Sequence, residues 1–171
     1  MASTQEESAA DGLILIGLGA NLPSRFGTPR QTLEAALDTI ATKGVRVTRR
    51  SRWWKSAPVP VSDQPWFVNG VAALETELPP EELLTLLHAV EAEFGRVRGA
   101  ANAARPLDLD LLAYGRLRRE GGLILPHPRM TDRSFVLLPL GDIAPFWRHP
   151  CGISLSRLIA ALPAEGRAEP I

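Results

Sequence analysis

One stretch of the 171-residue sequence alternates leucine with aspartate: Arg105-Pro106-Leu107-Asp108-Leu109-Asp110-Leu111-Leu112. Successive side chains on a β-strand point to opposite faces of the sheet. If this stretch is a strand, its leucines at 107, 109 and 111 fill one face. Asp108 and Asp110 then share the other face, roughly 7 Å apart at about 3.3 Å per residue. We therefore predict a strand with one apolar face and one face that carries two carboxylates.

The carboxylate pair has two explanations that spacing alone leaves open. Charges facing a core are costly unless they are compensated, and divalent cations would compensate them and would suit a phosphate-bearing substrate. The other explanation is a solvated edge or a set of salt bridges, for which Arg96, Arg98 and Arg105 are nearby candidates.

Composition narrows the class of protein. Lys+Arg and Asp+Glu are both 19, so the charge balance gives no general attraction to nucleic acid or anionic membranes. The single cysteine, Cys151, excludes an intrachain disulfide, which fits a reducing compartment. The sequence shows neither a signal peptide nor an apolar run of about 18 residues. We expect a cytoplasmic protein with a disordered polar tail over residues 1–11 and a single domain over 12–171.

Hydrophobic periodicity predicts the order strand, helix, strand, strand, helix, strand. Strands are expected at 13–19, 45–54, 66–74 and in the aspartate stretch, with a proline-rich loop over 55–65. The first helix should begin at Pro29, with Thr28 as N-cap and Gln31 completing a capping box. The second should open with Pro79-Pro80-Glu81-Glu82 and end at Gly95.

This order is typical of an α+β, ferredoxin-like βαββαβ core, an antiparallel sheet with helices packed on one face. The residues from Gly115 onward are expected to form a C-terminal appendage. Its parts are a short hairpin near 123–124 and helical pieces at 135–140 and 155–162.

Polar and aromatic residues at the ends of these elements are candidates for a site. Arginines suit bidentate phosphate recognition, and the sequence holds no Walker loop, Gly-x-Gly-x-x-Gly, nucleophile elbow or zinc pattern. A second group combines aromatic rings with one amide: Trp53, Trp54, Phe67, Asn69 and Phe135. It could sandwich a flat heterocycle whose edge is read by Asn69, or its rings could simply be core.

Taken together, these motifs resemble the 6-hydroxymethyl-7,8-dihydropterin pyrophosphokinases of folate biosynthesis. The resemblance runs from about Leu13 to about Leu162. It rests on the order and spacing of Gly17-Leu18-Gly19-Ala20-Asn21-Leu22, Asp63-Gln64-Pro65-Trp66-Phe67-Val68-Asn69, Glu91 with Gly95-Arg96-Val97-Arg98, Arg105 to Asp110, Pro126-His127-Pro128-Arg129-Met130, and Arg133 to Leu140.

The resemblance implies transfer of pyrophosphate from ATP to the pterin's hydroxymethyl oxygen with release of AMP, by an enzyme that uses two Mg²⁺. It implies a monomer whose partners are small molecules only. Asp108 and Asp110 match the metal ligands and, with Arg96 and Arg105, the catalytic residues. The positions that match the ATP site are Glu91, Arg98, Leu111, His127 and Arg133. Those that match the pterin pocket are Ser56, Ala57, Val59, Phe67, Asn69 and Phe135.

The loop over 99–104 departs from the family pattern, because it is short and lacks a tryptophan. Which aromatic ring closes over the pterin is left open by the sequence. Two rival functions also stay open: another Mg²⁺-dependent nucleotide phosphotransferase, and a non-catalytic ferredoxin-like ligand-binding module. The first would not need Asn69, and the second predicts no loss on changing Asp108.

Overall fold

Within the described residues, 4–95 and 106–171, six strands pair into one sheet in this computed structural model. The strand order is β5-β1-β4-β3-β6, with β2 also paired to β4, and every one of these pairings is antiparallel. The strands are β1 (Ile14–Ala20), β2 (Arg46–Arg50), β3 (Trp54–Ser56), β4 (Phe67–Glu75), β5 (Asp108–Tyr114) and β6 (Glu169–Pro170). The predicted antiparallel sheet is confirmed.

Two helices cover one face of this sheet, α2 (Pro29–Thr42) and α3 (Pro80–Glu93). The predicted capping box starts α2: the N–H of Gln31 donates to Thr28 Oγ1 at 3.2 Å, and the N–H of Thr28 donates to Gln31 Oε1 at 2.9 Å. Gly95 follows α3 with a φ of 90°, as expected of a helix-ending glycine. Both predicted helices are therefore confirmed.

The apolar face of β5 packs against these helices. Leu107, Leu109 and Leu111 belong to the same buried cluster as the leucines of α2 and α3. Leu112, on the face that carries the aspartates, belongs to the cluster on the other side of the sheet. The predicted alternation of the aspartate strand is confirmed.

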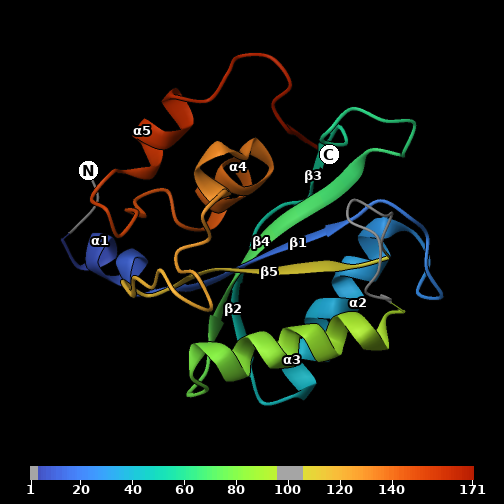
Figure 1. Ribbon diagram of the computed structural model, residues 1–171, viewed down its shortest axis with the longest axis horizontal. Coiled ribbons are helices and arrows are strands. Elements are labelled where there is room, and N and C mark those ends of the chain that lie inside the picture. Colours follow the sequence, from blue (N-terminus) through green and yellow to red (C-terminus); the bar gives the residue numbers. More distant parts are fainter. Residues whose placement is uncertain (1–3, 96–105) are drawn as a thin grey trace.

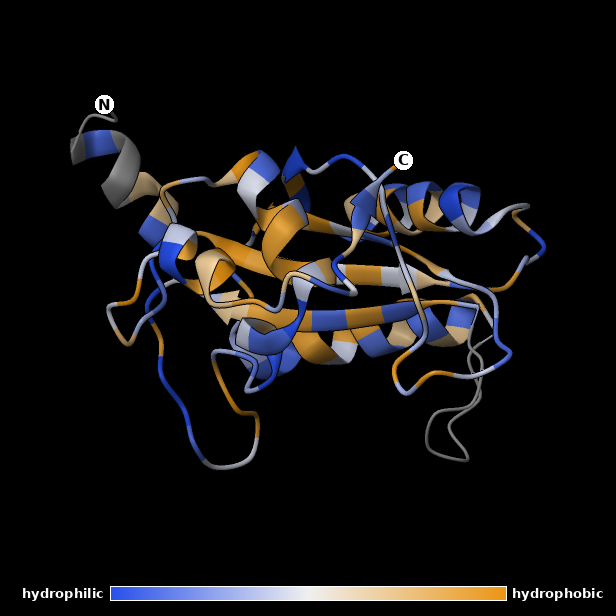
Figure 2. Cartoon of the chain, turned by 90° about the horizontal axis from the view of Figure 1, so that it is seen from above, coloured by the Kyte–Doolittle hydropathy of each residue, from blue (hydrophilic) through white to orange (hydrophobic). Residues whose placement is uncertain are grey.

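The second face of the sheet is also covered, by α4 (Ser134–Ile143) and α5 (Leu155–Ala160). Figure 1 shows α2 and α3 on one side of the strands and α4 and α5 on the other. Figure 2 shows hydrophobic residues concentrated in the central strands, with alternating stripes on the helices. The two helices of the predicted core lie on one face, as expected, and the apolar residues after Gly115, which the sequence did not place, bury the opposite face of the sheet.

The expected strand over 45–54 is two strands, β2 and β3, separated at Ser51–Trp53. At the break, the Ser51 hydroxyl replaces a backbone acceptor: it accepts from the N–H of Val71 at 2.9 Å. The Trp53 ring lies over Gly70, where an added Cβ would be 2.5 Å from Cζ3 of the ring. β3 then runs to Ser56, into the segment expected to be loop.

Three short elements had no clear sequence signal: α1 (Thr4–Asp11), the 3₁₀ turn η1 (Met130–Asp132), and β6. At the end of α1, Ala10 is buried, and Asp11 Oδ2 lies 3.5 Å from Arg116 Nη1. Arg96, Arg98, Arg105 and the 99–104 loop lie outside the described residues. Within the described ranges, no helix has the length and apolarity needed to cross a membrane.

Candidate active site

A row of paired residues crosses the sheet on the face that α4 covers. Asp108 of β5 lies opposite Gly19 of β1, Gly19 lies opposite Asn69 of β4, and Asn69 lies opposite Trp54 of β3. Neighbouring strands are about 4.8 Å apart, so Asp108 and Asn69 are roughly 10 Å apart across the sheet. The carboxylate pair and the amide predicted to read a heterocycle therefore share one face.

Glycine is needed between them. A Cβ at Gly19 would lie 3.2 Å from Asn69 Oδ1 and 4.0 Å from a ring carbon of Phe67. A Cβ at Gly17, opposite Asp110, would meet only Leu112 methyls at 3.5 Å. Because Gly19 has no side chain, this face of the sheet has free space beside Asn69.

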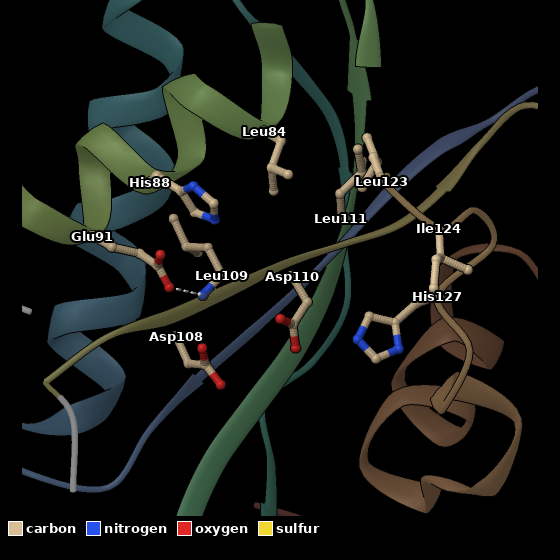
Figure 3. A pocket seen from close by; sticks show the side chains of 10 residues that line it. All are labelled: Leu84, His88, Glu91, Asp108, Leu109, Asp110, Leu111, Leu123, Ile124 and His127. Carbon is tan, nitrogen blue, oxygen red and sulfur yellow. Dashed lines mark hydrogen bonds between the residues drawn. The ribbon is translucent and has the colours of Figure 1, made fainter. Parts of the chain in front are cut away.

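A cavity of about 180 Å³ opens along β5, the edge strand. Its polar lining comes from two sides: His88 and Glu91 project from α3, and His127 projects from the opposite side, with Asp108 and Asp110 between them (Figure 3). Its apolar lining is Leu84, Leu109, Leu111, Leu123 and Ile124. The structure thus brings together five predicted site residues: Glu91, Asp108, Asp110, Leu111 and His127.

Glu91 fixes α3 against the edge strand. The carboxylate is 1% exposed, and its Oε2 accepts a hydrogen bond from the N–H of Leu109 at 2.9 Å. Residues 84, 88 and 91 recur at helical spacing, so one stripe of α3 faces the cavity. A backbone donor of the edge strand is satisfied by a side chain, which holds the cavity wall in place.

His127 lines the cavity in surroundings that favour its neutral form. The backbone N–H of His127 donates to Leu112 O at 2.8 Å, and its ring Nδ1 accepts from the backbone N–H of Arg129 at 3.1 Å. Burial lowers the pKa of His127 from its ordinary 6.5, and the charges of Arg133 and Arg129 lower it further, against a smaller opposing effect of Asp108. Because Nδ1 is an acceptor, the ring proton lies on Nε2, which makes Nε2 a hydrogen-bond donor.

Arg133 joins the two predicted subsites. Its Nη1 lies 3.8 Å from Asp110 Oδ2, and its guanidinium carbon lies 5.5 Å from the centre of the Phe135 ring. Both charged side chains are partly exposed, so the pair is open to a ligand from solvent. Arg133 thus places N–H donors beside Asp110, and its guanidinium makes a cation–π contact with the Phe135 ring.

The predicted pterin residues lie on β3, β4, α4 and the segment after β3. Asn69 and Ser56 are both buried, and Asn69 Nδ2 donates to Ser56 Oγ at 2.6 Å. Phe67, Phe135 and Ala57 are partly buried, whereas Val59 is 74% exposed. The amide and the hydroxyl are brought together, and Val59 lies at the solvent surface.

Sequence reasoning missed two polar residues of this region. His88 lines the cavity one turn before Glu91, a spacing that could have drawn attention to it. Asn21 was noted only as part of a motif. It is buried, and its Nδ2 donates to Gln64 Oε1 at 3.0 Å and to Pro65 O at 3.3 Å, which ties the end of β1 to the segment leading into β4.

Comparison with solved structures supports the fold described above. A solved structure of Plasmodium falciparum HPPK-DHPS with pterin and p-hydroxybenzoate shares the fold, with a TM-score of 0.66 at 13% identity over 86% of this chain and 43% of that one. The mitochondrial folate synthesis bifunctional protein of Arabidopsis thaliana is 41% identical over 142 residues, which are 82% of this chain and 25% of that protein.

A shorter relative matches over nearly its whole length. It is the 2-amino-4-hydroxy-6-hydroxymethyldihydropteridine pyrophosphokinase of Pseudomonas aeruginosa, 44% identical over 155 residues, which are 90% of this chain and 93% of that one. The family model for 7,8-dihydro-6-hydroxymethylpterin-pyrophosphokinase matches residues 15–145. This chain therefore belongs to the 7,8-dihydro-6-hydroxymethylpterin-pyrophosphokinase family.

Proposed function

We propose that Asp108 and Asp110 hold two Mg²⁺ ions for the reaction of this family, the transfer of pyrophosphate from ATP to 6-hydroxymethyl-7,8-dihydropterin in folate biosynthesis. The observation that carries the proposal is their shared face on β5, two strands from Asn69. Across the described ranges, no three His, Cys, Asp or Glu side chains gather closely enough to hold a metal ion. Two carboxylates nevertheless fit Mg²⁺, which usually keeps several waters and takes its other ligands from substrate phosphates.

Bound Mg²⁺ would neutralise phosphate charge and lower the pKa of the pterin hydroxyl that attacks the β-phosphorus. The chain's own donors flank the aspartates. His127 donates from Nε2 without adding charge, and Arg133 donates from a guanidinium that is always protonated. Arg96 and Arg105 are proposed to meet the phosphates as charge moves to the leaving AMP.

The cavity along β5 is proposed as the nucleotide subsite. Its apolar end, formed by Leu84, Leu111 and Leu123, suits a flat base or the sugar's carbon face, and its polar end carries Glu91 and His88. Arg98 is assigned to ATP by the resemblance alone.

The pterin subsite is proposed on the same face at β4. Asn69, held by Ser56, would read the heterocycle's edge through its amide, and Phe67 and Phe135 would supply apolar and stacking surface. Ala57 and Val59 would border the ring from the segment after β3.

We also propose the topology and the domain organisation of the chain. The order β5-β1-β4-β3 with β2 beside β4 supports a ferredoxin-like core, with the residues after Gly115 as a C-terminal appendage that packs on its second face. We further propose a single domain over 12–171 that works in the cytoplasm as a monomer on small-molecule substrates.

Product analysis tests the reaction and its site. The protein is mixed with Mg²⁺, ATP and 6-hydroxymethyl-7,8-dihydropterin, and AMP release is followed for wild type, Asp110→Ala and Asn69→Ala. We expect AMP from wild type, loss of activity in Asp110→Ala, and a raised pterin KM in Asn69→Ala. Release of ADP would favour another phosphotransferase, and full activity of Asp110→Ala would remove the aspartate pair from the metal site.

A further inference from the structure

One carboxylate on α4, that of Asp142, accepts hydrogen bonds from residues at the break between β2 and β3. Asp142 Oδ2 accepts from the indole Nε1 of Trp54 at 2.9 Å and from the backbone N–H of Arg52 at 3.2 Å. Its Oδ1 accepts from the guanidinium of Arg52 at 3.3 and 3.1 Å. The Asp142 side chain is only 16% exposed and its bond to Trp54 is partly buried, whereas the bonds from Arg52 lie at the solvent surface.

The partners of Asp142 occupy fixed places relative to the proposed pterin subsite. Trp54 lies two residues before Ser56 on β3, so the two side chains share a face. Asp142 lies seven residues after Phe135 on α4, two helical turns or about 10.5 Å, so these two also share a face. The hydrogen bond between Asp142 and Trp54 therefore links α4, which carries Phe135, to β3, which carries Ser56 and pairs with the strand of Asn69.

A second contact holds the same end of α4. Arg49 of β2 donates from Nη1 to the carbonyl oxygen of Ile143 at 2.7 Å, at the helix C-terminus. At the other end, Pro139 has no N–H, so it cannot donate to the carbonyl of Phe135 as position i+4 normally does. The helix nevertheless runs unbroken from Ser134 to Ile143, so contacts at its C-terminal end also bear on the position of Phe135 in its first turn.

We propose that Asp142 is a positioning residue for pterin binding: by gripping Trp54 and the backbone of Arg52, it sets the separation between Phe135 and the Ser56–Asn69 pair. This rests on the pterin subsite proposed above. Loss of the carboxylate would leave the Trp54 indole N–H and the Arg52 N–H without their acceptor and would release α4 from β3. Pterin affinity should fall while the ATP cavity along β5 is left intact.

The test is steady-state kinetics with each substrate varied in turn. In Asp142→Ala we expect the pterin KM to rise about tenfold, equivalent to about 1.4 kcal/mol, with the ATP KM within about twofold of wild type. Asp142→Asn keeps an oxygen acceptor for Trp54, so its pterin KM should rise no more than about threefold. Trp54→Phe, which removes the indole N–H together with part of the ring, should raise the pterin KM at least about threefold and keep the ATP KM.

Controls separate positioning from general stability and from the subsite itself. Asp38→Ala removes another Asp–Arg pair, with Arg50 at 3.6 Å, and should leave both KM values unchanged. Equal increases in both KM values for Asp142→Ala, or an unchanged pterin KM in either Asp142→Ala or Trp54→Phe, would overturn the proposal. If Asn69→Ala raises the pterin KM and Asp142→Ala does not, positioning fails and the subsite stands. If neither does, the subsite assignment itself fails.

Discussion

Gly19→Ala adds one methyl group between the two proposed subsites, and its effect follows from the sheet geometry. The new Cβ would lie 3.2 Å from Asn69 Oδ1, inside the 3.4 Å at which ordinary Cβ contacts begin. The amide must therefore move by a few tenths of an ångström, although Ser56 holds it from the other side at 2.6 Å. Misaligning one or two hydrogen bonds to a ligand, at about 1 kcal/mol each, raises the pterin KM about five- to thirtyfold.

Gly17→Ala is the matched control, because it makes the same change on the same strand and face. Its Cβ would meet only Leu112 methyl groups at 3.5 Å, an ordinary contact. AMP release is measured with pterin varied at saturating ATP and then the reverse, and thermal unfolding is recorded for both variants. We expect only Gly19→Ala to change the pterin KM, with the ATP KM unchanged. A shift of the same size in Gly17→Ala, or none in Gly19→Ala, would refute the steric argument.

Three further predictions concern the metal site, pH and the first helix. Asp110→Asn should reduce the rate of AMP formation at least about 100-fold at saturating Mg²⁺ and ATP, because it removes one charge of the pair; a rate near wild type would count against metal binding there. The folded-state pKa of His127 lies below its ordinary 6.5, so its neutral form contributes stability that is complete above pH 6.5 and is lost as pH falls below that value. Urea midpoints from pH 7.5 to 5.5 should fall less steeply in His127→Gln than in wild type, and His149, whose pKa burial also lowers, acts equally in both proteins. Thr28→Ala should lower the free energy of unfolding by about 1 kcal/mol and Thr28→Ser by less, measured by urea titration, since Thr28 caps α2; equal losses would exclude the cap as the cause.

Local patterns predicted much of this fold and of the aspartate pair. Asp108 and Asp110 lie on one face because strand geometry alternates side chains whatever surrounds them. The Thr28–Gln31 capping box formed as predicted because all its atoms lie within four residues. The β2–β3 break could not be predicted in this way, since it depends on Asp142, 90 residues away from Arg52.

By itself, the sequence determined the main helices and strands of the core, the face of β5 that carries the carboxylates, and the family resemblance, because each depends on neighbours in the chain or on the order of motifs. Only the tertiary structure decided which residues lie opposite one another across the sheet and across the cavity. Strand pairing placed Gly19 between Asp108 and Asn69. Folding brought His88 and His127 to opposite sides of one cavity. The chain after Gly115 closed over the second face because that face of the sheet is apolar and gains free energy from burial. Such contacts join residues far apart in sequence, and no local periodicity records them.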